Sequence, residues 1–217
     1  MDTFSKQFID FTITHQILKF GEFKTKAGRT SPYFFNLGLI SNGLGLKKLG
    51  EFYGNFILEK NISFDMLFGP AYKGISLVSS TAIALSSQNL KDINFAFNRK
   101  EVKNHGEGGQ VIGYPISGNV LILDDVISAG TAIRESIEII KSQGGNPQGV
   151  VVAIDRQEKG QGELSATEEI KSLYNLNVHS LICLDDIIEY INKDDKYWEY
   201  RSSFLIYSMM SFRQIKE

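Results

Sequence analysis

The fold is decided by one stretch of the chain, Val120-Leu-Ile-Leu-Asp-Asp-Val-Ile-Ser-Ala-Gly-Thr-Ala132. Its apolar start predicts a buried strand over 119–123, and the carboxylates of Asp124 and Asp125 follow at the carboxyl end of that strand. Small residues then lead into a helix that we expect over 131–143. A strand that passes through a short loop into a helix is the repeating unit of an α/β protein.

The same alternation of apolar runs and helical periods continues on both sides of this stretch. Strands are predicted at 66–68, 94–98, 119–123, 149–155 and 178–182, and helices at 46–60, 75–87, 131–143 and 165–175, before a helical C-terminal remainder. Continuous apolar strands that alternate with helices indicate a parallel sheet covered on both faces. Because ligands bind at the carboxyl ends of such strands, the candidate site loops follow Phe68, Asn98, Leu123 and Asp155.

Two regions depart from this alternation. Near the N-terminus, apolar side chains with a 4-3-4-3 spacing from Phe4 to Leu18 predict a helix, which Gly21 ends. The aromatic residues within 22–40 surround a turn and predict a short antiparallel hairpin. Residues 99–114 are rich in glycine and charge and have no apolar period, so we expect a mobile loop there.

Composition excludes several classes of protein. The chain of 217 residues carries 23 Lys+Arg against 25 Asp+Glu, a formal charge of −2, which argues against gripping a nucleic-acid backbone. The single cysteine, Cys183, excludes an intrachain disulfide and a Cys/His metal cluster. No apolar run approaches the roughly 20 residues that span a bilayer, and no secretory signal opens the chain. We therefore expect a cytoplasmic protein without nucleic-acid or membrane partners.

The loop that follows the acidic pair suits a phosphate group. Residues 128–131 (Ser-Ala-Gly-Thr) leave their backbone N–H groups unobstructed, and the helix N-terminus behind them supplies positive potential. Asp124 and Asp125 cannot contact phosphate favourably, so they suit hydroxyls or the water shell of a metal ion. Phosphate beside vicinal hydroxyls is a ribose 5-phosphate. The structural alternative is a strand-end acid pair with a helix cap, and the attached Gly-Thr loop favours the functional interpretation.

Two further loops suit a polyanion. The segment 99–109 (Arg-Lys-Glu-Val-Lys-Asn-His-Gly-Glu-Gly-Gly) carries cations that would repel one another unless an anion joins them, and its glycines allow it to fold over a ligand. A solvated charged loop is the alternative. The segment 69–74 (Gly-Pro-Ala-Tyr-Lys-Gly) follows a strand and precedes a helix, so its N–H groups and Lys73 could hold a pyrophosphate. Gly-Pro alone is mostly a turn.

Two features suit a planar base that carries a carboxylate. In the hairpin, the consecutive rings of Phe34 and Phe35 could stack on such a base, although one ring in the core and one on the surface fits the spacing equally well. Arg156 follows Asp155 at a strand's carboxyl end, where it could grip a carboxylate with two hydrogen bonds. A structural ion pair is the alternative for Arg156.

These segments together resemble a known family. The 120–132 stretch is similar to the phosphoribosyl-pyrophosphate (PRPP) signature of the type I phosphoribosyltransferases. The Lys26–Asn36 hairpin and the Lys-x-His-Gly loop resemble the orotate phosphoribosyltransferases among them, in the same order over about 1–212. One departure is Ser128, where close relatives usually carry threonine. The resemblance implies a single domain, 1–217, with a central parallel sheet flanked by helices, a hood over about 1–40 and a mobile catalytic loop over 99–110.

The resemblance also implies a reaction and its residues. The family converts orotate and PRPP to orotidine 5′-monophosphate and pyrophosphate in UMP synthesis, with Mg²⁺ held by PRPP and, through water, by the acidic pair rather than by a direct protein ligand. Activity depends on a homodimer in which the 99–109 loop reaches the neighbouring site. The catalytic residues would be Lys103, His105, Asp124 and Asp125. The PRPP site would comprise Lys26, Tyr72, Lys73, Arg99, Lys100, Lys103, His105, Asp124, Asp125, Val126, Ile127, Ser128, Ala129, Gly130, Thr131 and Ala132. The orotate site would comprise Phe34, Phe35, Ser128 and Arg156.

Three other functions stay open at this point. A purine phosphoribosyltransferase shares the 120–132 stretch but has no need for Arg156 or the hairpin. A PRPP-sensing regulator would need a nucleic-acid surface, and a pI near 6.0 without a basic stripe speaks against one. A receiver-like domain that uses Asp124 and Asp125 would leave the cationic loop unexplained.

Overall fold

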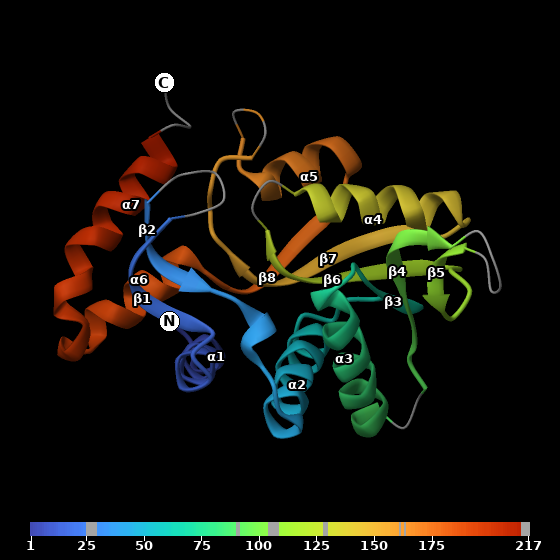
Figure 1. The fold of residues 1–217 in the computed structure, drawn as a ribbon, viewed down its shortest axis with the longest axis horizontal. Helices are drawn as coiled ribbons and strands as arrows, with labels where there is room; N and C mark the ends of the chain where they lie inside the picture. The colour runs from blue at the N-terminus through green and yellow to red at the C-terminus, as the bar shows by residue number, and fades with distance from the viewer. Residues whose placement is uncertain are drawn as a thin grey trace.

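The centre of the protein is a six-stranded sheet with helices on both sides (Figure 1). This computed structural model describes residues 1–24, 30–89, 92–103, 109–127, 130–160, 162 and 164–213. The strand order is β5-β4-β3-β6-β7-β8, and every neighbouring pair is parallel except β4 and β5. The strands are β3 (Met66–Gly69), β4 (Asn94–Lys103), β5 (Gly109–Gly113), β6 (Asn119–Ile127), β7 (Asn146–Asp155) and β8 (Asn177–Cys183). The expected parallel sheet is therefore confirmed.

Helices cover both faces of this sheet, as the alternating sequence predicts. In Figure 1, α2 and α3 lie below the sheet, and α4 and α5 lie above it. The four helices are α2 (Gly43–Glu59), α3 (Lys73–Asn89), α4 (Thr131–Ser142) and α5 (Ala166–Tyr174). The expected helix over 165–175 is present as α5 and begins with a capping box, because Ser165 and Glu168 each satisfy the other's backbone N–H.

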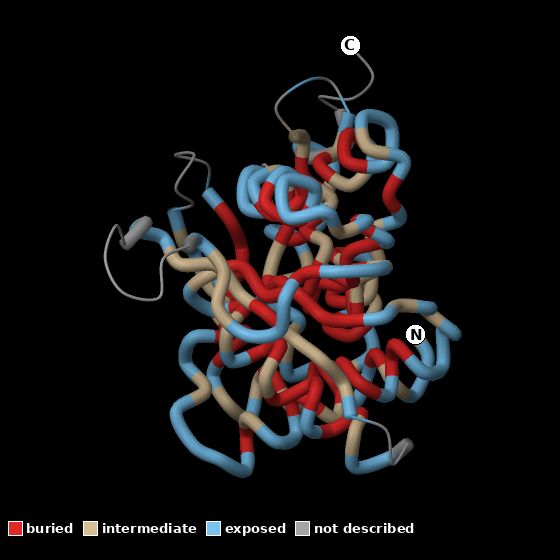
Figure 2. Tube along the Cα trace, turned by 90° about the vertical axis from the view of Figure 1, so that its right-hand side faces the viewer, coloured by how far each residue is buried: buried red, intermediate tan, exposed pale blue. Residues whose placement is uncertain are grey.

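The buried side chains of β6 show why both layers are needed. Leu121 and Leu123 join the hydrophobic cluster under α2 and α3, whereas Val120 and Ile122 join the cluster under α4. All four are fully buried, since successive side chains of a strand point to opposite faces. Figure 2 shows this buried interior enclosed by exposed helix surfaces. The carboxyl end of β6 is thus anchored from both sides.

The N-terminal hood consists of α1 (Thr3–Thr14), the hairpin β1 (Leu18–Lys24) and β2 (Thr30–Phe35), and a short 3-10 helix, η1 (Leu37–Leu39). The hairpin is confirmed, but the expected helix up to Leu18 is too long. Gln16 has a left-handed backbone with φ 57°, which turns the chain, and Leu18 then pairs with Phe35 in the hairpin. Leu18 is buried from a strand rather than from a helix, so its helical spacing is coincidental.

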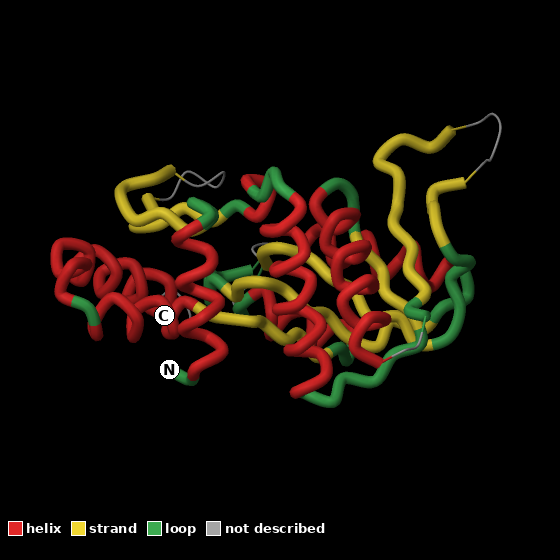
Figure 3. The backbone as a smooth tube through the Cα atoms, turned by 90° about the horizontal axis from the view of Figure 1, so that it is seen from below, coloured by secondary structure: helices red, strands yellow, loops and turns green. Residues whose placement is uncertain are grey.

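The C-terminal remainder forms two α-helices rather than one. They are α6 (Leu184–Lys193) and α7 (Arg201–Arg213), separated by the 3-10 helix η2 (Asp195–Tyr200). The break occurs at Asp194, which has an extended backbone and caps η2 through Lys196 N–H. Phe204 of α7 packs on Phe20 and Tyr33 of the hairpin, with ring centroids 5.7 and 5.6 Å apart. The hairpin and α7 therefore pack together at one end of the molecule (Figures 1 and 3).

Residues 99–114 contain regular structure where the sequence pattern predicted a loop. β4 continues to Lys103 and pairs with β5, with Ala96 opposite Gly113 and Lys103 opposite Gly109. Figure 3 shows these two strands as an arm that stands out from the body of the protein. An antiparallel pair needs only backbone hydrogen bonds, so an arm that buries few side chains has no apolar period to detect. Residues 104–108 lie outside the described part of the chain.

Within the described ranges, no helix is both long and apolar enough to cross a bilayer.

Candidate active site

The acidic pair lies inside β6. The sequence predicted that this strand ends at Leu123, but it continues as far as Ile127. Asp124 and Asp125 are each only 8% exposed. The Asp125 N–H donates to Asp124 Oδ1 at 2.8 Å, and the Val126 N–H donates to Asp125 Oδ1 at 2.9 Å. From α2, the buried hydroxyl of Tyr53 donates to the backbone carbonyl of Asp124 at 2.7 Å. The pair is therefore held rigidly at the sheet's carboxyl edge.

Burial disfavours the ionised form of this acidic pair. Loss of hydration, and then the neighbouring carboxylate of Asp125, raise the pKa of Asp124 from its ordinary value of 3.8 to about 7. Lys73, the first residue of α3, forms an ion pair with Asp125 and offsets part of that repulsion. Two carboxylates with one cation attract hydroxyl donors or a further cation.

The chemistry of this pair fits an ion that keeps most of its water. Among the described residues, no group of three or more His, Cys, Asp and Glu side chains is placed to hold a metal ion. Mg²⁺ is commonly bound by one or two carboxylates together with water and substrate phosphates. Asp124 and Asp125 match that smaller donor set.

The loop after β3 carries Tyr72 and Lys73 to the same carboxyl end of the sheet. It is fixed to the next strand because the Ala71 N–H donates to Asn98 Oδ1 at 2.7 Å. From β4, Lys100 Nζ lies 4.9 Å from the ring centre of the exposed Tyr72. Lys100 of β4 therefore lies beside the same segment whose Lys73 pairs with Asp125.

Close backbone packing shapes this loop. A Cβ atom on Gly69 would lie 2.1 Å from the carbonyl oxygen of Gly74, well inside any tolerated contact. The turn can bring Lys73 back towards the sheet only with glycine at Gly69.

We expect Gly69→Ala to lower the free energy of unfolding by about 2 kcal/mol, because the clash is with backbone atoms that must shift. The same variant should raise the KM for a pyrophosphate-bearing substrate, since the loop holds Lys73. Urea unfolding measures the first effect. Gly54→Ala on α2 is the matched control, because its new Cβ would meet Leu85 at an ordinary 3.5 Å. Equal losses in the two variants would contradict this account.

The loop after β6 begins the predicted phosphate site. Gly130 has φ +72°, a left-handed backbone that favours glycine, and its lack of a side chain leaves the first turn of α4 without a side-chain cap. Thr131 and Ala132 are the first residues of α4, and Val126 and Ile127 end β6. Ser128 and Ala129 lie outside the described residues.

One cleft of about 1140 Å³ lies between the loop after β3, the strand β4 and the helix α4, and neither Asp124 nor Asp125 is among its described lining residues. Pro70 and Ala71 line it from the first loop, and Arg99 and Lys100 line it from β4. Thr131 and Ala132 line it from the first turn of α4. The structure thus brings the predicted pyrophosphate and phosphate loops to a common space.

The two hairpin aromatics have different surroundings. Phe35 is 7% exposed and belongs to the core, whereas Phe34 is 37% exposed and packs against Phe23 with ring centroids 5.6 Å apart. Adjacent residues in a strand point to opposite faces, so both rings cannot stack on one ligand. The arrangement with one ring in the core is the one observed, and only Phe34 presents its ring.

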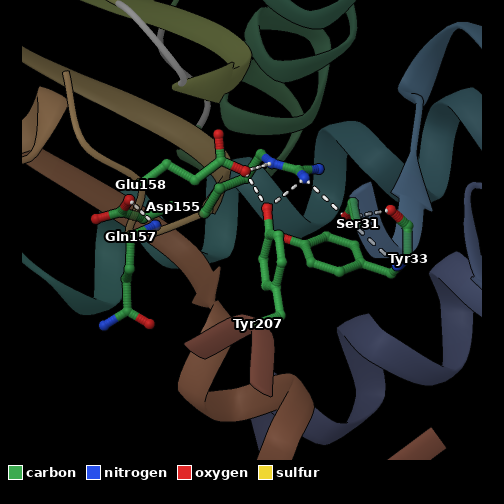
Figure 4. Close-up of polar contacts among 7 residues, drawn as sticks. Ser31, Tyr33, Asp155, Gln157, Glu158 and Tyr207 are labelled. Carbon is green, nitrogen blue, oxygen red and sulfur yellow. Dashed lines mark hydrogen bonds and ion pairs between the residues drawn. The ribbon is translucent and has the colours of Figure 1, made fainter. Parts of the chain in front are cut away.

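Arg156 lies at the end of β7 in a buried polar cluster (Figure 4). Its Nε donates to Glu158 Oε1 at 2.6 Å, and its Nη2 donates to Ser31 Oγ at 3.1 Å and to the Tyr207 hydroxyl at 2.9 Å. The guanidinium also lies 4.4 Å from the ring centre of Tyr33. Its ion-pair partner is Glu158 rather than the adjacent Asp155.

Several predicted site residues lie outside the described part of the chain. Lys26 and His105 fall in undescribed segments, and Lys103 ends β4 without a described side chain. Sequence reasoning missed Tyr53, Asn98, Ser31, Glu158 and Tyr207. Of these, Asn98 and Glu158 had a usable signal, because Asn98 ends a predicted strand and Glu158 lies in the loop after another.

The phosphoribosyl transferase domain model matches residues 40–181, the part of the chain that holds the acidic pair, Lys73 and the start of α4, so the protein is a phosphoribosyltransferase. Among curated relatives, the orotate phosphoribosyltransferase of Thiobacillus denitrificans is 52% identical over 194 residues, which cover 89% of this chain and 91% of that protein. That of Laribacter hongkongensis is 56% identical over 191 residues, covering 88% and 89%. The chain belongs to the orotate phosphoribosyltransferase family.

Solved structures agree with this assignment. The crystal structure of orotate phosphoribosyltransferase from Francisella tularensis superimposes with a TM-score of 0.78 at 40% identity, covering 91% of this chain and 98% of that one. The Mycobacterium tuberculosis enzyme in complex with PRPP gives a TM-score of 0.61 at 14% identity, covering 86% and 92%. At that identity the second comparison shows a shared fold.

Proposed function

We propose that this chain transfers the 5-phosphoribosyl group of PRPP to orotate, which gives orotidine 5′-monophosphate and pyrophosphate in de novo pyrimidine (UMP) biosynthesis. The observation that carries the proposal is the common cleft, where Arg99 and Lys100 face the same space as Thr131 and Ala132. A diphosphate and a monophosphate on one ribose need two such regions. The names of the relatives support orotate as the base.

The reaction sets two requirements for the site. The bond from ribose C1′ to the pyrophosphate oxygen breaks, and orotate N1 forms the new bond to C1′. As in glycoside hydrolysis, the transition state is oxocarbenium-like. The protein must stabilise negative charge on the departing pyrophosphate and hold the base on the opposite side of the sugar.

The ribose 5-phosphate would be held at residues 128–132, against the uncapped first turn of α4. Asp124 and Asp125 would accept hydrogen bonds from the ribose hydroxyls and orient Mg²⁺ through water. When bound, Mg²⁺ would supply charge neutralisation at the pyrophosphate. The raised pKa of Asp124 suits this role, because a hydroxyl donor or a cation favours its ionised form.

The pyrophosphate would be surrounded by side chains from the loop after β3 and from the β4–β5 arm. These are Tyr72, Lys73, Arg99, Lys100, Lys103 and His105. The observed contact between Lys100 and Tyr72 supports a shared role for the two segments. We assign charge neutralisation at the leaving oxygen to Lys103.

The base would be bound by Arg156 together with Lys26, Phe34, Phe35 and Ser128. Arg156 is cationic and charge-complementary to the orotate carboxylate. The projecting arm in Figure 3 supports a homodimer in which the arm reaches the neighbouring subunit's site, and we place this homodimer in the cytoplasm.

Arg156→Ala should raise the KM for orotate by about tenfold or more, because a charged hydrogen bond to the carboxylate is lost. The KM for PRPP should change little. Steady-state kinetics with each substrate varied in turn measures both constants. Equal increases in the two KM values would refute the carboxylate contact.

The test of the proposed function is loss of orotate absorbance near its ultraviolet maximum, with purified protein, PRPP and Mg²⁺. We expect rapid loss that requires all three components, and none with hypoxanthine, guanine or adenine in place of orotate. Turnover of a purine without turnover of orotate would overturn the base assignment. Tight PRPP binding without any turnover would instead indicate a PRPP sensor.

A further inference from the structure

Arg156 is fixed by one neighbouring side chain and by two side chains from distant parts of the chain. Glu158 follows it in the loop after β7, Ser31 comes from β2, and Tyr207 comes from α7 (Figure 4). Arg156, Glu158 and Tyr207 are all at most 9% exposed. Such contacts, made away from water, hold a guanidinium in one orientation.

The distribution of these contacts leaves one side of the guanidinium available. The Nε–H is used by Glu158, and both hydrogens of Nη2 are used by Ser31 and Tyr207. Among the residues that the structure describes, none accepts a hydrogen bond from Nη1.

The Tyr207 hydroxyl connects the two anchors of this arrangement. It accepts from Arg156 Nη2 and donates to Glu158 Oε1, so arginine, glutamate and tyrosine form a closed triangle. Its ring packs edge-on against Tyr33, with centroids 6.0 Å apart and planes at 88°. The ring and the hydroxyl therefore have separate roles, packing and orientation.

The geometry points to Glu158 and Tyr207 as positioning residues for base selection. They hold Arg156 by Nε and Nη2 so that Nη1 is presented to the carboxylate of the incoming base. This inference rests on the proposed function and extends it, because it brings the C-terminal helix α7 into the recognition of orotate. Glu158 also neutralises Arg156 while the base is absent, which removes the cost of a buried unpaired cation.

The decisive variant is Tyr207→Phe, which keeps the ring and removes only the hydroxyl. We expect its KM for orotate to rise about tenfold, as for loss of one hydrogen bond to a charged group, while the KM for PRPP stays within about twofold. Tyr190→Phe on α6 is the matched control, because its hydroxyl donates to Asp10 at 2.6 Å, away from Arg156. That control should leave both constants unchanged.

Glu158 provides a rescue test in the same assay. Glu158→Ala should raise the KM for orotate. Glu158→Gln should show a much smaller rise, since its amide oxygen still accepts from Arg156 Nε. If Glu158→Ala does not fold, Tyr207→Phe decides the question alone. An unchanged or lowered orotate KM in Tyr207→Phe, or equal rises in both KM values, would overturn the inference. A wild-type protein that does not consume orotate would instead overturn the proposed function itself.

Discussion

Asp124→Asn should give a protein that is more stable than the wild type at pH 8 and has lost most of its transferase activity. The reason is the buried acidic pair, in which the ionised Asp124 is disfavoured by desolvation and by Asp125. Asparagine has nearly the same shape, and its Oδ1 can still accept from the Asp125 N–H. The substitution removes the charge and keeps the packing.

The sign of the pH dependence follows from the raised pKa. The folded-state value is about 7 against an ordinary 3.8, so the wild type loses stability as the pH rises between these values. Asparagine does not titrate, and the variant therefore gains on the wild type over the same range. At pH 8 we expect a gain of about 1 to 4 kcal/mol in the free energy of unfolding, and near pH 4 almost none.

Urea unfolding at pH 4, 6 and 8 measures this gain. Asp65→Asn is the control, because Asp65 is exposed and only caps the Asn119 N–H at 2.7 Å. If the gain in the free energy of unfolding were no larger at pH 8 than at pH 4, ionised Asp124 would not destabilise the fold. The kcat should fall by about 100-fold or more, as for loss of one preorganised electrostatic contact in a buried site.

Lys103→Ala should lower kcat by about 100-fold while PRPP binding remains measurable. The proposed role of Lys103 is to meet charge that develops on the leaving oxygen, and such an interaction contributes mainly in the transition state. Removing it therefore affects kcat more than the KM for PRPP. Lys103 ends β4 at the tip of the described arm, so its loss should not disturb the core.

Steady-state kinetics together with PRPP binding by calorimetry separates these two effects. Lys141→Ala is the control, because Lys141 lies at the C-terminal end of α4 over the ring of Tyr174. It should leave both quantities unchanged. An unaltered kcat in Lys103→Ala would exclude the leaving-group role, and loss of PRPP binding alone would assign Lys103 to ground-state binding.

The parts of the fold that bury a regular face were predictable. β6 was clear because four consecutive apolar residues precede Asp124, and α5 was clear because Ser165 and Glu168 form a capping box. The β4–β5 arm was not, since its pairing depends on backbone hydrogen bonds that leave no mark on side-chain order. The end of α1 was misplaced because Leu18 meets the helical spacing and is buried from a strand.

The site was predictable where its residues lie close together in the sequence, just after a predicted strand. The acidic pair, Lys73 and the helix start at Thr131 each follow a predicted strand within a few residues. The partners of Arg156 were not predictable, because Tyr207 lies 51 residues away and Ser31 lies 125 residues away. Only the packing of the hairpin against α7 brings them together.

The match to the phosphoribosyl transferase domain ends before α7 and begins after the hairpin, since it covers residues 40–181. The acidic pair and the start of α4 lie within it, whereas Ser31, Phe34 and Tyr207 lie outside. On the proposed function, most residues that hold PRPP lie in the middle of the chain, whereas the base is held by Arg156 of that middle part together with residues of the two ends. Substitutions in the two terminal segments could therefore change which base is accepted while the residues that bind the phosphoribosyl group stay the same.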